Sequence, residues 1–424
     1  MQTLLAILTG KVIAYLSRIL KLGGGSAAPG LYALKIDHNL VKRLAKQIPK
    51  TIIITGTNGK TTTAKMLAHF VQTQDFKVIR NSTGSNLERG IASTLISRAN
   101  LLGKLAPVDL AIWELDEAAF NTLAPKLNPD IIVFLNAFRD QLDRYGEVDT
   151  VVNHWQQTLE KIDPSTTLII NGDDKNTASL KRNFTGKTIV FGLENYRISG
   201  EGKIQTELKT DLQAKKIKNN GLSGTEFEVL DNKVKLNLPG VYQIYNLLAA
   251  LGSSIQLGID ISGSIKSLSS FSAAFGRVEK ISLGAKEAYI MLIKNPVGAT
   301  QVFATISPNL NTNDELLIAL NDNFADGTDV SWIWDANFEN LKSQMLNVKC
   351  ICSGTRAYEL ALRLKYAGFN AKNLIVESNL SLAFKLAKAS SSKRLFILPT
   401  YTAMLQLQHL LTSSGVKKHY WRES

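Results

Sequence analysis

The chain has 424 residues, 45% of them hydrophobic, and its 49 lysines and arginines exceed its 36 acidic residues, giving a net charge of +13. That length is too great for one hydrophobic core, so we expect two or three domains of ordinary globular composition. The positive excess favours an anionic partner: a nucleotide, a nucleic acid, a phosphorylated substrate or an acidic membrane surface. Because the basic residues are dispersed, and the denser patches at 209–218 and 417–418 are better explained as solvated faces, we expect no nucleic-acid partner.

The sequence contains two cysteines, Cys350 and Cys352. Two cysteines alone cannot build a disulfide framework or a four-cysteine zinc site. Their spacing within the run 348–352 predicts a strand that carries both side chains on one face. We interpret them as buried apolar residues in a reducing cytosol.

The N-terminal residues 3–20 are apolar but include Lys11 and Arg18. Lys11 lies near the middle of the run, which argues against a transmembrane span. A signal peptide would place its charges before the apolar run, whereas here they lie within and after it. We predict an amphipathic helix that ends at the glycines 23–25 and either packs on the protein or lies on a membrane surface, with packing favoured.

The next feature is a glycine loop between a short apolar strand at 52–54 and a helical pattern at 64–70. Glycines let successive backbone N–H groups point at one anion, and the helix N-terminus adds a partial positive charge. Lys60 can reach the β- and γ-phosphates of ATP, and the hydroxyl of Thr61 or Thr62 can hold Mg²⁺. The loop is shorter than the usual pattern, whose first glycine would fall at Ile54, and the alternative is an ordinary turn. The residues expected to bind the nucleotide are Gly56, Thr57, Asn58, Gly59, Lys60, Thr61 and Thr62.

Strand and helix patterns alternate after this loop. Expected strands lie at 77–79, 109–113, 131–134 and 167–170, and expected helices at 91–99, 118–123 and 151–162. Short apolar strands that alternate with helices indicate a parallel sheet covered on both faces, an α/β fold. Ligands on such sheets bind at the carboxyl ends of the strands.

Polar residues follow these strands where that rule expects them. Glu114 ends one strand, and a carboxylate that faces a phosphate loop is suited to hold Mg²⁺, although charged residues commonly end strands. Asn136 and residues 139–144 follow the next strand, where a salt-bridged helix start is an equal alternative. Arg277 could neutralise a transferring phosphoryl group, or it could be a surface arginine in a linker.

The patterns also divide the chain. Glycine-punctuated polar stretches at 196–240 predict a small antiparallel β insertion, which a helix at 247–257 follows. A second alternation begins near 289, with expected strands at 289–293, 315–320, 348–352, 374–376 and 394–398. We expect an N-terminal helical segment at 1–45, a P-loop central domain at 46–278 and a smaller C-terminal α/β domain at 279–424.

Several motifs resemble the ATP-binding middle domain of the Mur ligases: TGTNGKTTT (55–63), NGDD (171–174), YNLLAA (245–250) and FGRVE (275–279). Others resemble, more narrowly, the MurT group, the ligase subunits of lipid II isoglutaminyl synthase. These are GSNLERGI (84–91), ELDE (114–117), NAFRDQLDRYGEVDT (136–150), KNPVGA (294–299), LNDNFADGTDVSWIWD (320–335), GTRAYELALRLKYAG (354–368) and LPTYTAML (398–405). The resemblance covers nearly the whole chain.

The resemblance implies an ATP-dependent ligase that amidates the D-glutamate α-carboxylate of the lipid II stem peptide to D-isoglutamine through an acyl phosphate. The ammonia would come from a GatD-type glutaminase partner, which agrees with the lack of a plausible cysteine nucleophile here. By resemblance, Lys60 and Thr61 bind phosphate and Mg²⁺, Glu114 is a metal ligand and Asn246 contacts the adenine. Asp329 would belong to the surface that meets the partner and orient the glutaminase histidine, whereas the sequence alone favours an ordinary turn aspartate.

Two departures from the family pattern matter. Many members carry a four-cysteine zinc ribbon in the middle domain, but residues 200–235 contain no cysteine, so we expect no zinc. Gln141 stands where the amino-acid-adding Mur ligases have a metal-associated histidine, which favours the amidating branch.

The expected location is the cytoplasm, and contact with an anionic surface at the inner face of the plasma membrane stays open. Two other functions were weighed: a free-standing amino-acid-adding ligase of Mur or folylpolyglutamate type, which would ignore ammonium, and a non-catalytic basic binding protein.

Overall fold

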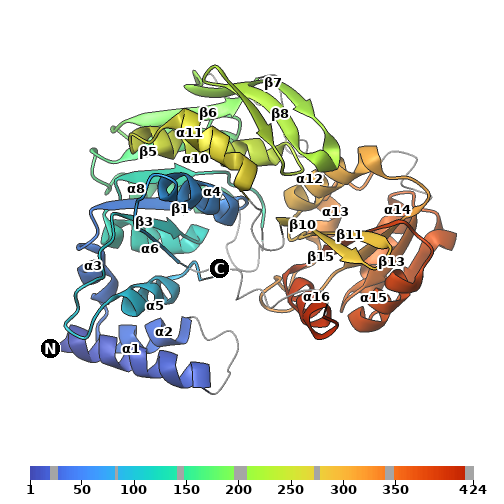
Figure 1. Cartoon of the computed structure of the whole chain (residues 1–424), viewed down its shortest axis with the longest axis horizontal. Coiled ribbons are helices and arrows are strands. Elements are labelled where there is room, and N and C mark those ends of the chain that lie inside the picture. The colour runs from blue at the N-terminus through green and yellow to red at the C-terminus, as the bar shows by residue number, and fades with distance from the viewer. Residues whose placement is uncertain are drawn as a thin grey trace.

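The computed structural model describes residues 1–19, 27–81, 85–140, 148–194, 208–271, 277–339 and 348–415. Two α/β units follow one another along the chain and lie side by side (Figure 1). Over the described residues, the first unit has a nine-stranded sheet and the second a six-stranded sheet, and most strand pairs in both are parallel. The predicted fold class is confirmed.

The first unit comprises the helices α1 (Gln2–Ile19), α2 (Ala28–Ile36), α3 (Leu40–Ala45), α4 (Lys60–Gln72), α5 (Glu88–Arg98), α6 (Glu117–Leu127), α8 (Val148–Leu159), α9 (Lys175–Ser179), α10 (Tyr242–Gln256) and α11 (Ile261–Ser267). Its strands are β1 (Lys50–Thr55), β2 (Val78–Arg80), β3 (Leu110–Glu114), β4 (Ile131–Phe134), β5 (Thr167–Asn171), β6 (Thr188–Leu193), β7 (Leu212–Asn219), β8 (Thr225–Val229) and β9 (Asn232–Leu236).

The central strand β1 shows why this sheet is covered on both faces. Ile53 packs into one hydrophobic cluster with α5 and α6, whereas Ile52 and Ile54 pack into a second cluster with α4 and α10. Successive side chains of a strand point to opposite faces, so a run of consecutive isoleucines needs helices on both sides. The apolar run in the sequence therefore predicted the layer order.

The strand order is β2-β3-β1-β4-β5-β6-β7-β8-β9. β1 pairs in parallel with both β3 and β4, so the carboxyl ends of these three strands meet at one edge of the sheet. This arrangement brings the glycine loop, Glu114 and Asn136 to a common edge, where α/β sheets bind ligands.

The predicted antiparallel insertion is continuous with the central sheet. β7, β8 and β9 pair antiparallel, as predicted, but β7 also pairs in parallel with β6, where Phe191 lies opposite Leu212. The sequence analysis had not identified β6. Residues 195–207 of the insertion lie outside the described chain, as does Gln141.

The second unit comprises β10 (Arg277–Leu283), β11 (Lys286–Met291), α12 (Pro296–Ile306), β12 (Asp314–Ala319), α13 (Trp332–Asp335), β13 (Lys349–Ser353), α14 (Ala357–Tyr366), β14 (Leu374–Val376), α15 (Leu380–Ala389), β15 (Arg394–Pro399) and α16 (Tyr401–Ser413). Its strand order is β10-β11-β15-β12-β13-β14, and only the β10–β11 pair among these described strands is antiparallel. The five strands predicted after residue 285 are present, whereas β10 was not predicted. Cys350 and Cys352 are buried free thiols in one hydrophobic cluster, as predicted.

The N-terminal helix α1 packs on the protein. Ala6, Ile7 and Gly10 are buried, and a methyl group placed at Gly10 would lie 2.8 Å from Ile96 of α5. Thr3 donates a hydrogen bond to Asp37, and Arg43 of α3 pairs with the same carboxylate at 2.8 Å. No helix within the described ranges is long and apolar enough to cross a bilayer.

Candidate active site

The glycine loop joins β1 to α4 through a backbone that requires glycine at two positions. Gly56 has φ 132° and Gly59 has φ 94°, which lie in the left-handed range that other residues rarely adopt. A Cβ at Gly59 would also lie 2.1 Å from the Asn246 Oδ1 atom of α10. The loop can therefore curl tightly at the N-terminus of α4, where helices bind phosphate.

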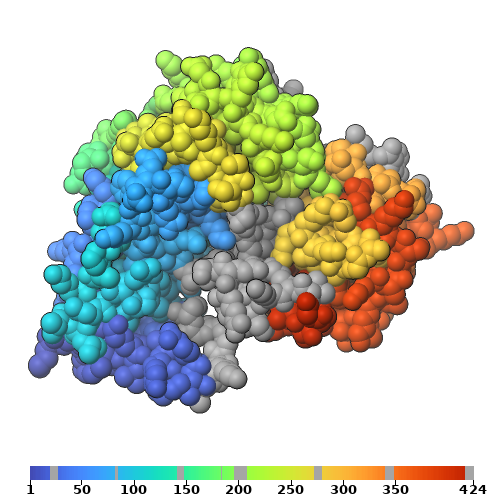
Figure 2. Space-filling view, viewed as in Figure 1, coloured from blue at the N-terminus to red at the C-terminus, as the bar shows by residue number. Residues whose placement is uncertain are grey.

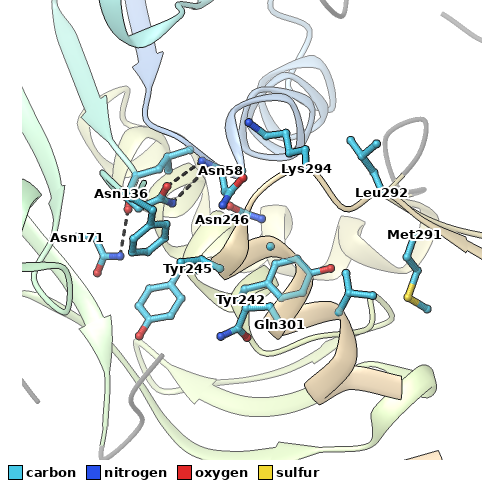
Figure 3. Close-up of a pocket in the computed structure, with 16 residues that line it drawn as sticks. Asn58, Asn136, Asn171, Tyr242, Tyr245, Asn246, Met291, Leu292, Lys294 and Gln301 are labelled. Carbon is cyan, nitrogen blue, oxygen red and sulfur yellow. Dashed lines mark hydrogen bonds between the residues drawn. The ribbon is translucent and has the colours of Figure 1, made fainter. Parts of the chain in front are cut away.

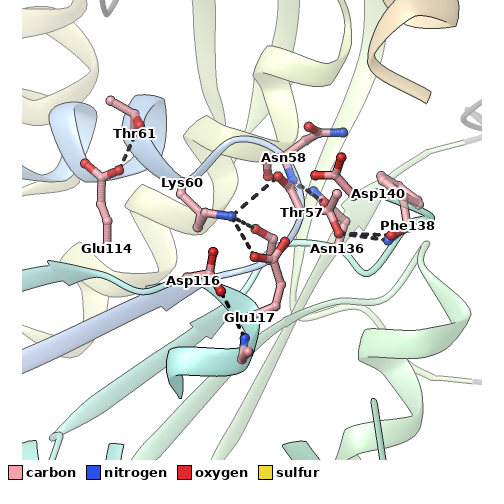
Figure 4. A network of polar contacts seen from close by, with 12 residues as sticks. Thr57, Asn58, Lys60, Thr61, Glu114, Asp116, Glu117, Asn136, Phe138 and Asp140 are labelled. Carbon is pink, nitrogen blue, oxygen red and sulfur yellow. Dashed lines mark hydrogen bonds and ion pairs between the residues drawn. The ribbon is translucent and has the colours of Figure 1, made fainter. Parts of the chain in front are cut away.

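A neighbouring strand end fixes the loop. The backbone N–H of Asn58 donates to Asn136 Oδ1 at 2.8 Å, and Asn136 Nδ2 donates to the Asn58 carbonyl at 3.0 Å. Thr57 N–H in turn donates to the Asn136 carbonyl at 3.0 Å. Asn136, whose role the sequence left open, thus acts as a two-sided clamp on the loop (Figure 4).

Lys60 lies beside an acidic side chain to which the sequence assigned no role. Its Nζ atom is 3.3 Å from Glu117 Oε2 and also donates to the carbonyl oxygens of Gly56 and Thr57 (Figure 4). Burial raises the pKa of Glu117, and the positive charges of Lys60 and Lys294 oppose that rise. These contacts hold Lys60 over the loop, and an anion seated there could replace them.

Thr61 and Glu114 form a compact oxygen pair. The Thr61 hydroxyl donates to Glu114 Oε2 at 2.7 Å, and Asn81 holds the Glu114 backbone by accepting from its N–H and donating to its carbonyl, both at 2.9 Å. A hydroxyl and a carboxylate are hard ligands of the kind that Mg²⁺ prefers and shares with phosphate oxygens. The described residues contain no cluster of three or more His, Cys, Asp or Glu side chains placed for a metal.

The second unit contacts the loop directly. Asn295 caps α12 and exchanges side-chain amide hydrogen bonds with Asn58, at 3.1 and 3.3 Å. Lys294 pairs with Asp140, and Arg139 pairs with Asp335 at 2.6 Å. Residues 136–140 form neither helix nor strand, and Arg139 and Asp140 join the two units. The rest of the segment 139–144, for which the sequence left a salt-bridged helix start open, lies outside the described residues.

A pocket opens between these surfaces. It is lined by residues of the loop and strand ends, of α10 and of the second unit, as Figure 3 shows: Asn58, Gly59, Leu135, Asn136, Phe138, Asn171, Tyr242, Tyr245, Asn246, Met291, Leu292, Lys294, Val297, Gly298, Gln301 and Val302. Asn246 is buried beside the loop, where its Nδ2 donates to Gln243 at 2.8 Å. Aromatic, aliphatic and amide side chains next to a phosphate loop suit a nucleobase and its sugar.

Of the predicted site residues, Asp329 lies outside both the loop and the pocket lining, and only the backbone of Arg277 is described, paired with the pocket residue Met291. Asp329 is exposed in the loop after β12, and its carboxylate accepts hydrogen bonds from the N–H and hydroxyl of Ser331 at 2.8 and 2.9 Å. These bonds lower its pKa, as expected of an aspartate that caps a turn. The backbone of Arg277 opens β10, and its side chain lies outside the described part of the structure.

Sequence reasoning assigned no role to Glu117, Lys294 or Asn295, although all three lie in motifs that it singled out, ELDE and KNPVGA. Membership in these two motifs was the signal that could have identified the three residues. What the sequence could not show is that KNPVGA lies against the loop, because the Asn58–Asn295 contact spans 237 positions.

Comparisons with known proteins agree with this geometry. Residues 54–254 match the family of Mur ligase middle domains, and residues 292–404 match the MurT ligase C-terminal family. The chain is 32% identical to the lipid II isoglutaminyl synthase (glutamine-hydrolyzing) subunit MurT of Streptococcus pneumoniae, over 98% of each chain. It is 30% identical to the same subunit of Staphylococcus aureus, over 92% of this chain and 93% of that one. Its fold resembles the MurF ligase of Thermotoga maritima solved with ADP, with a TM-score of 0.66, 16% identity, and coverage of 92% and 85% of the two chains.

Proposed function

Because this chain belongs to the MurT group of the Mur ligase family, we propose that it is the ATP-dependent ligase subunit that amidates the D-glutamate α-carboxylate of the lipid II stem peptide to D-isoglutamine. The observation that carries this proposal is the paired arrangement of Lys60 with the loop and of Thr61 with Glu114, at the edge where the KNPVGA segment meets the loop. A carbon–nitrogen ligase needs such a place to polarise ATP beside an acceptor carboxylate.

The proposed reaction has two steps. A carboxylate oxygen attacks the γ-phosphorus of ATP, the bond to ADP breaks, and an acyl phosphate forms. Ammonia then attacks the carbonyl carbon, inorganic phosphate leaves with the electron pair of the C–O bond, and the nitrogen releases a proton. Charge spreads over the γ-phosphoryl oxygens in the first step, and Lys60 is placed to stabilise it.

Each site residue has a proposed role. Residues 56–62 bind the phosphates through backbone N–H groups and the side chain of Lys60, and Thr61 and Glu114 hold Mg²⁺, which would neutralise phosphate charge. Asn246 binds the adenosine part of ATP, and Arg277 contributes positive charge near the phosphates.

The segments 1–45, 46–278 and 279–424 are proposed as N-terminal, central and C-terminal domains, with water excluded where the last two meet.

The ammonia is proposed to come from a glutaminase subunit of GatD type. The relatives are named as subunits of a glutamine-hydrolysing enzyme, and both cysteines of this chain are buried in β13, away from any such role. Asp329 is exposed on the second unit, which makes its carboxylate accessible to a partner. Because the substrate is a lipid, we place the enzyme in the cytoplasm at the inner face of the plasma membrane.

The test uses the purified full-length chain with lipid II, ATP, Mg²⁺ and ammonium chloride, and mass spectrometry of the product. We expect exchange of one carboxyl OH for NH₂ per stem peptide, dependent on ATP and on Lys60. Parallel reactions replace ammonium with single amino acids. Incorporation of an amino acid, with ammonium ignored, would show an amino-acid-adding ligase and reject the proposal.

A further inference from the structure

We propose that the outer side of α1 is a docking surface for an anionic lipid bilayer. The proposal rests on the proposed function, because it supplies that site with a membrane-anchored substrate. The relevant residues form an apolar stripe along the helix, defined as Leu5, Leu8, Val12, Tyr15, Leu16 and Ile19, which are 47–63% exposed.

The stripe lies opposite the buried side of α1. Its members recur every three or four residues, which places them on one side of a helix. The residues that face the protein, Ala6, Ile7 and Gly10, fall between these positions. Solvent-facing sides of helices are normally polar, so a helix that is apolar on both sides needs a second apolar neighbour.

Further exposed apolar residues lie on segments that contact α1. Leu101 and Leu102 are exposed in the turn before Gly103, where a Cβ would lie 3.6 Å from the side chains of Leu4 and Ile7. Leu31 and Tyr32 are exposed on α2, the helix packed against α1. Figure 2 shows α1 and α2 together along one edge of the molecule, where a flat surface could reach both.

The charge of this region indicates which apolar neighbour fits. Residues 1–50 contain eight lysines and arginines and one acidic residue, and one of the eight, Lys50, pairs with Asp130 outside this segment. The acidic residue, Asp37, is buried and paired with Arg43. Lys11 and Arg18 lie within α1, which has no acidic residue at all. Basic side chains around an apolar stripe are the pattern of helices that lie in the interface of an anionic membrane.

Other apolar neighbours explain less of this pattern. A second copy of the chain would bring Lys11 and Arg18 of its own α1 against the same basic residues of the first, and α1 has no acidic residue to offset them. An anionic lipid surface satisfies both the charge and the apolar stripe, since long basic side chains can reach the headgroups while the stripe enters the acyl boundary. α1 is held to the fold by Thr3, so binding would orient the whole first unit.

The test measures binding of the full-length chain to lipid vesicles that contain no lipid II. Leu5, Leu8, Val12 and Leu16 are each changed to Gln, which keeps helix propensity and removes the apolar stripe. We expect the native chain to bind phosphatidylglycerol vesicles and the variant to bind at least about 30-fold more weakly. The matched control, Tyr358→Gln with Leu362→Gln on α14, removes exposed apolar side chains of the second unit and should bind as the native chain does.

A second pair of measurements separates charge from apolar contact, and the second of them uses the native chain, so that it does not depend on the folding of a variant. Lys11→Gln with Arg18→Gln should weaken binding to anionic vesicles about tenfold at low salt, and have little effect on weak binding to phosphatidylcholine. In the native chain, hydrogen exchange of residues 2–19 should slow when anionic vesicles are added. The proposal is overturned if the variant with Gln at Leu5, Leu8, Val12 and Leu16 binds anionic vesicles as the native chain does. It is also overturned if vesicles leave the hydrogen exchange of residues 2–19 unchanged.

Activity separates this proposal from the proposed function. The variant with Gln at the four stripe positions should amidate lipid II poorly when the lipid is in vesicles. It should act at the native rate on a short-chain, water-soluble analogue of lipid II. If the native chain amidates neither substrate, the proposed function is rejected. The vesicle-binding measurements would still test the docking surface independently. Self-association of the native chain in light scattering that the Gln variant loses, without vesicle binding, would show the stripe to be a protein interface instead.

Discussion

The two units carry polar residues at the same place, the carboxyl ends of parallel strands, but they use them differently. In the first unit, β1 ends in a glycine loop, and Lys60 makes contacts that an anion could replace. In the second unit, Lys294 and Asn295 after β11 reach the first unit, but the ends of β12 and β15 are joined by hydrogen bonds of their own. Asp326 accepts from the N–H and the hydroxyl of Thr402 at 2.7 and 2.5 Å, and Asn321 and Asn323 both donate to that hydroxyl.

The two strand edges differ in what their polar side chains do. Burial raises the pKa of Asp326 and the Thr402 hydrogen bonds oppose that rise, which describes a structural carboxylate. That network holds the loop after β12, which carries Asp329 to the surface. A polar strand end is therefore not enough to indicate a ligand site, because the glycine loop distinguishes the edge proposed to bind ATP from the edge that holds a loop in place.

The largest expected difference between the two strand edges is at Lys60. We expect Lys60→Ala to lower the amidation rate by about 10³-fold or more, because it removes the cation over the transferring phosphoryl group. Ammonium-dependent amidation of lipid II, followed by mass spectrometry, measures this. The matched change at the other edge, Asp326→Asn, should lower the free energy of unfolding by about 1–3 kcal/mol yet leave nucleotide affinity unchanged. Equal losses of amidation rate in both variants would erase the distinction.

The next effect concerns Asp329. Asn at this position can still accept the Ser331 N–H, so Asp329→Asn keeps the turn and removes only the charge. We expect glutamine-dependent amidation, assayed with the glutaminase subunit, to fall about 100-fold, with ammonium-dependent amidation within about twofold of native. If both nitrogen sources are affected equally, Asp329 is a residue of the ligase reaction or of the fold.

The contact between the units is expected to have a smaller effect. Asn295→Ser preserves a cap for α12 but is too short to reach Asn58. We expect the KM for ATP to rise about tenfold with little change in the melting temperature, because the loop loses a partner from the second unit. Asn295→Ala removes the cap as well and should also lower the unfolding free energy by about 1 kcal/mol. An unchanged KM in both variants would show that the loop is ordered by Asn136 alone.

Local patterns predicted the glycine loop, its flanking strand and helix, and most strands of both units, because each depends on neighbouring residues. β10 was not predicted, because it is an edge strand rich in polar residues and only its pairing with β11 makes it a strand. The sequence singled out Glu114 among the carboxylates of 114–117, but it gave no role to Glu117. Asp116 caps α6, and the start of that helix turns Glu117 toward Lys60.

The smallest expected effect distinguishes the buried carboxylate beside Lys60 from an exposed one. The folded-state pKa of Glu117 is raised above its ordinary value of 4.5, so its stabilising contribution is complete below that value and is lost as pH rises through the raised pKa. Glu117→Gln lacks this titration. The difference in unfolding free energy between native and variant should therefore shift against the native chain as pH rises from about 4.5, measured by denaturant unfolding at several pH values.

Glu339 supplies the control of opposite sign for that measurement. Its hydrogen bond from Arg363, at 2.8 Å, lowers its pKa, so its contribution is present above the ordinary value of 4.5 and is lost as pH falls through the lowered pKa. Glu339→Gln should thus show a native advantage that shrinks on acidification, damped because the carboxylate is largely exposed. Parallel pH trends for the two variants would mean that Lys60 holds Glu117 as an ordinary ion pair. The polar groups at the edge with the glycine loop would then be as fully paired as those at the strand ends of the second unit.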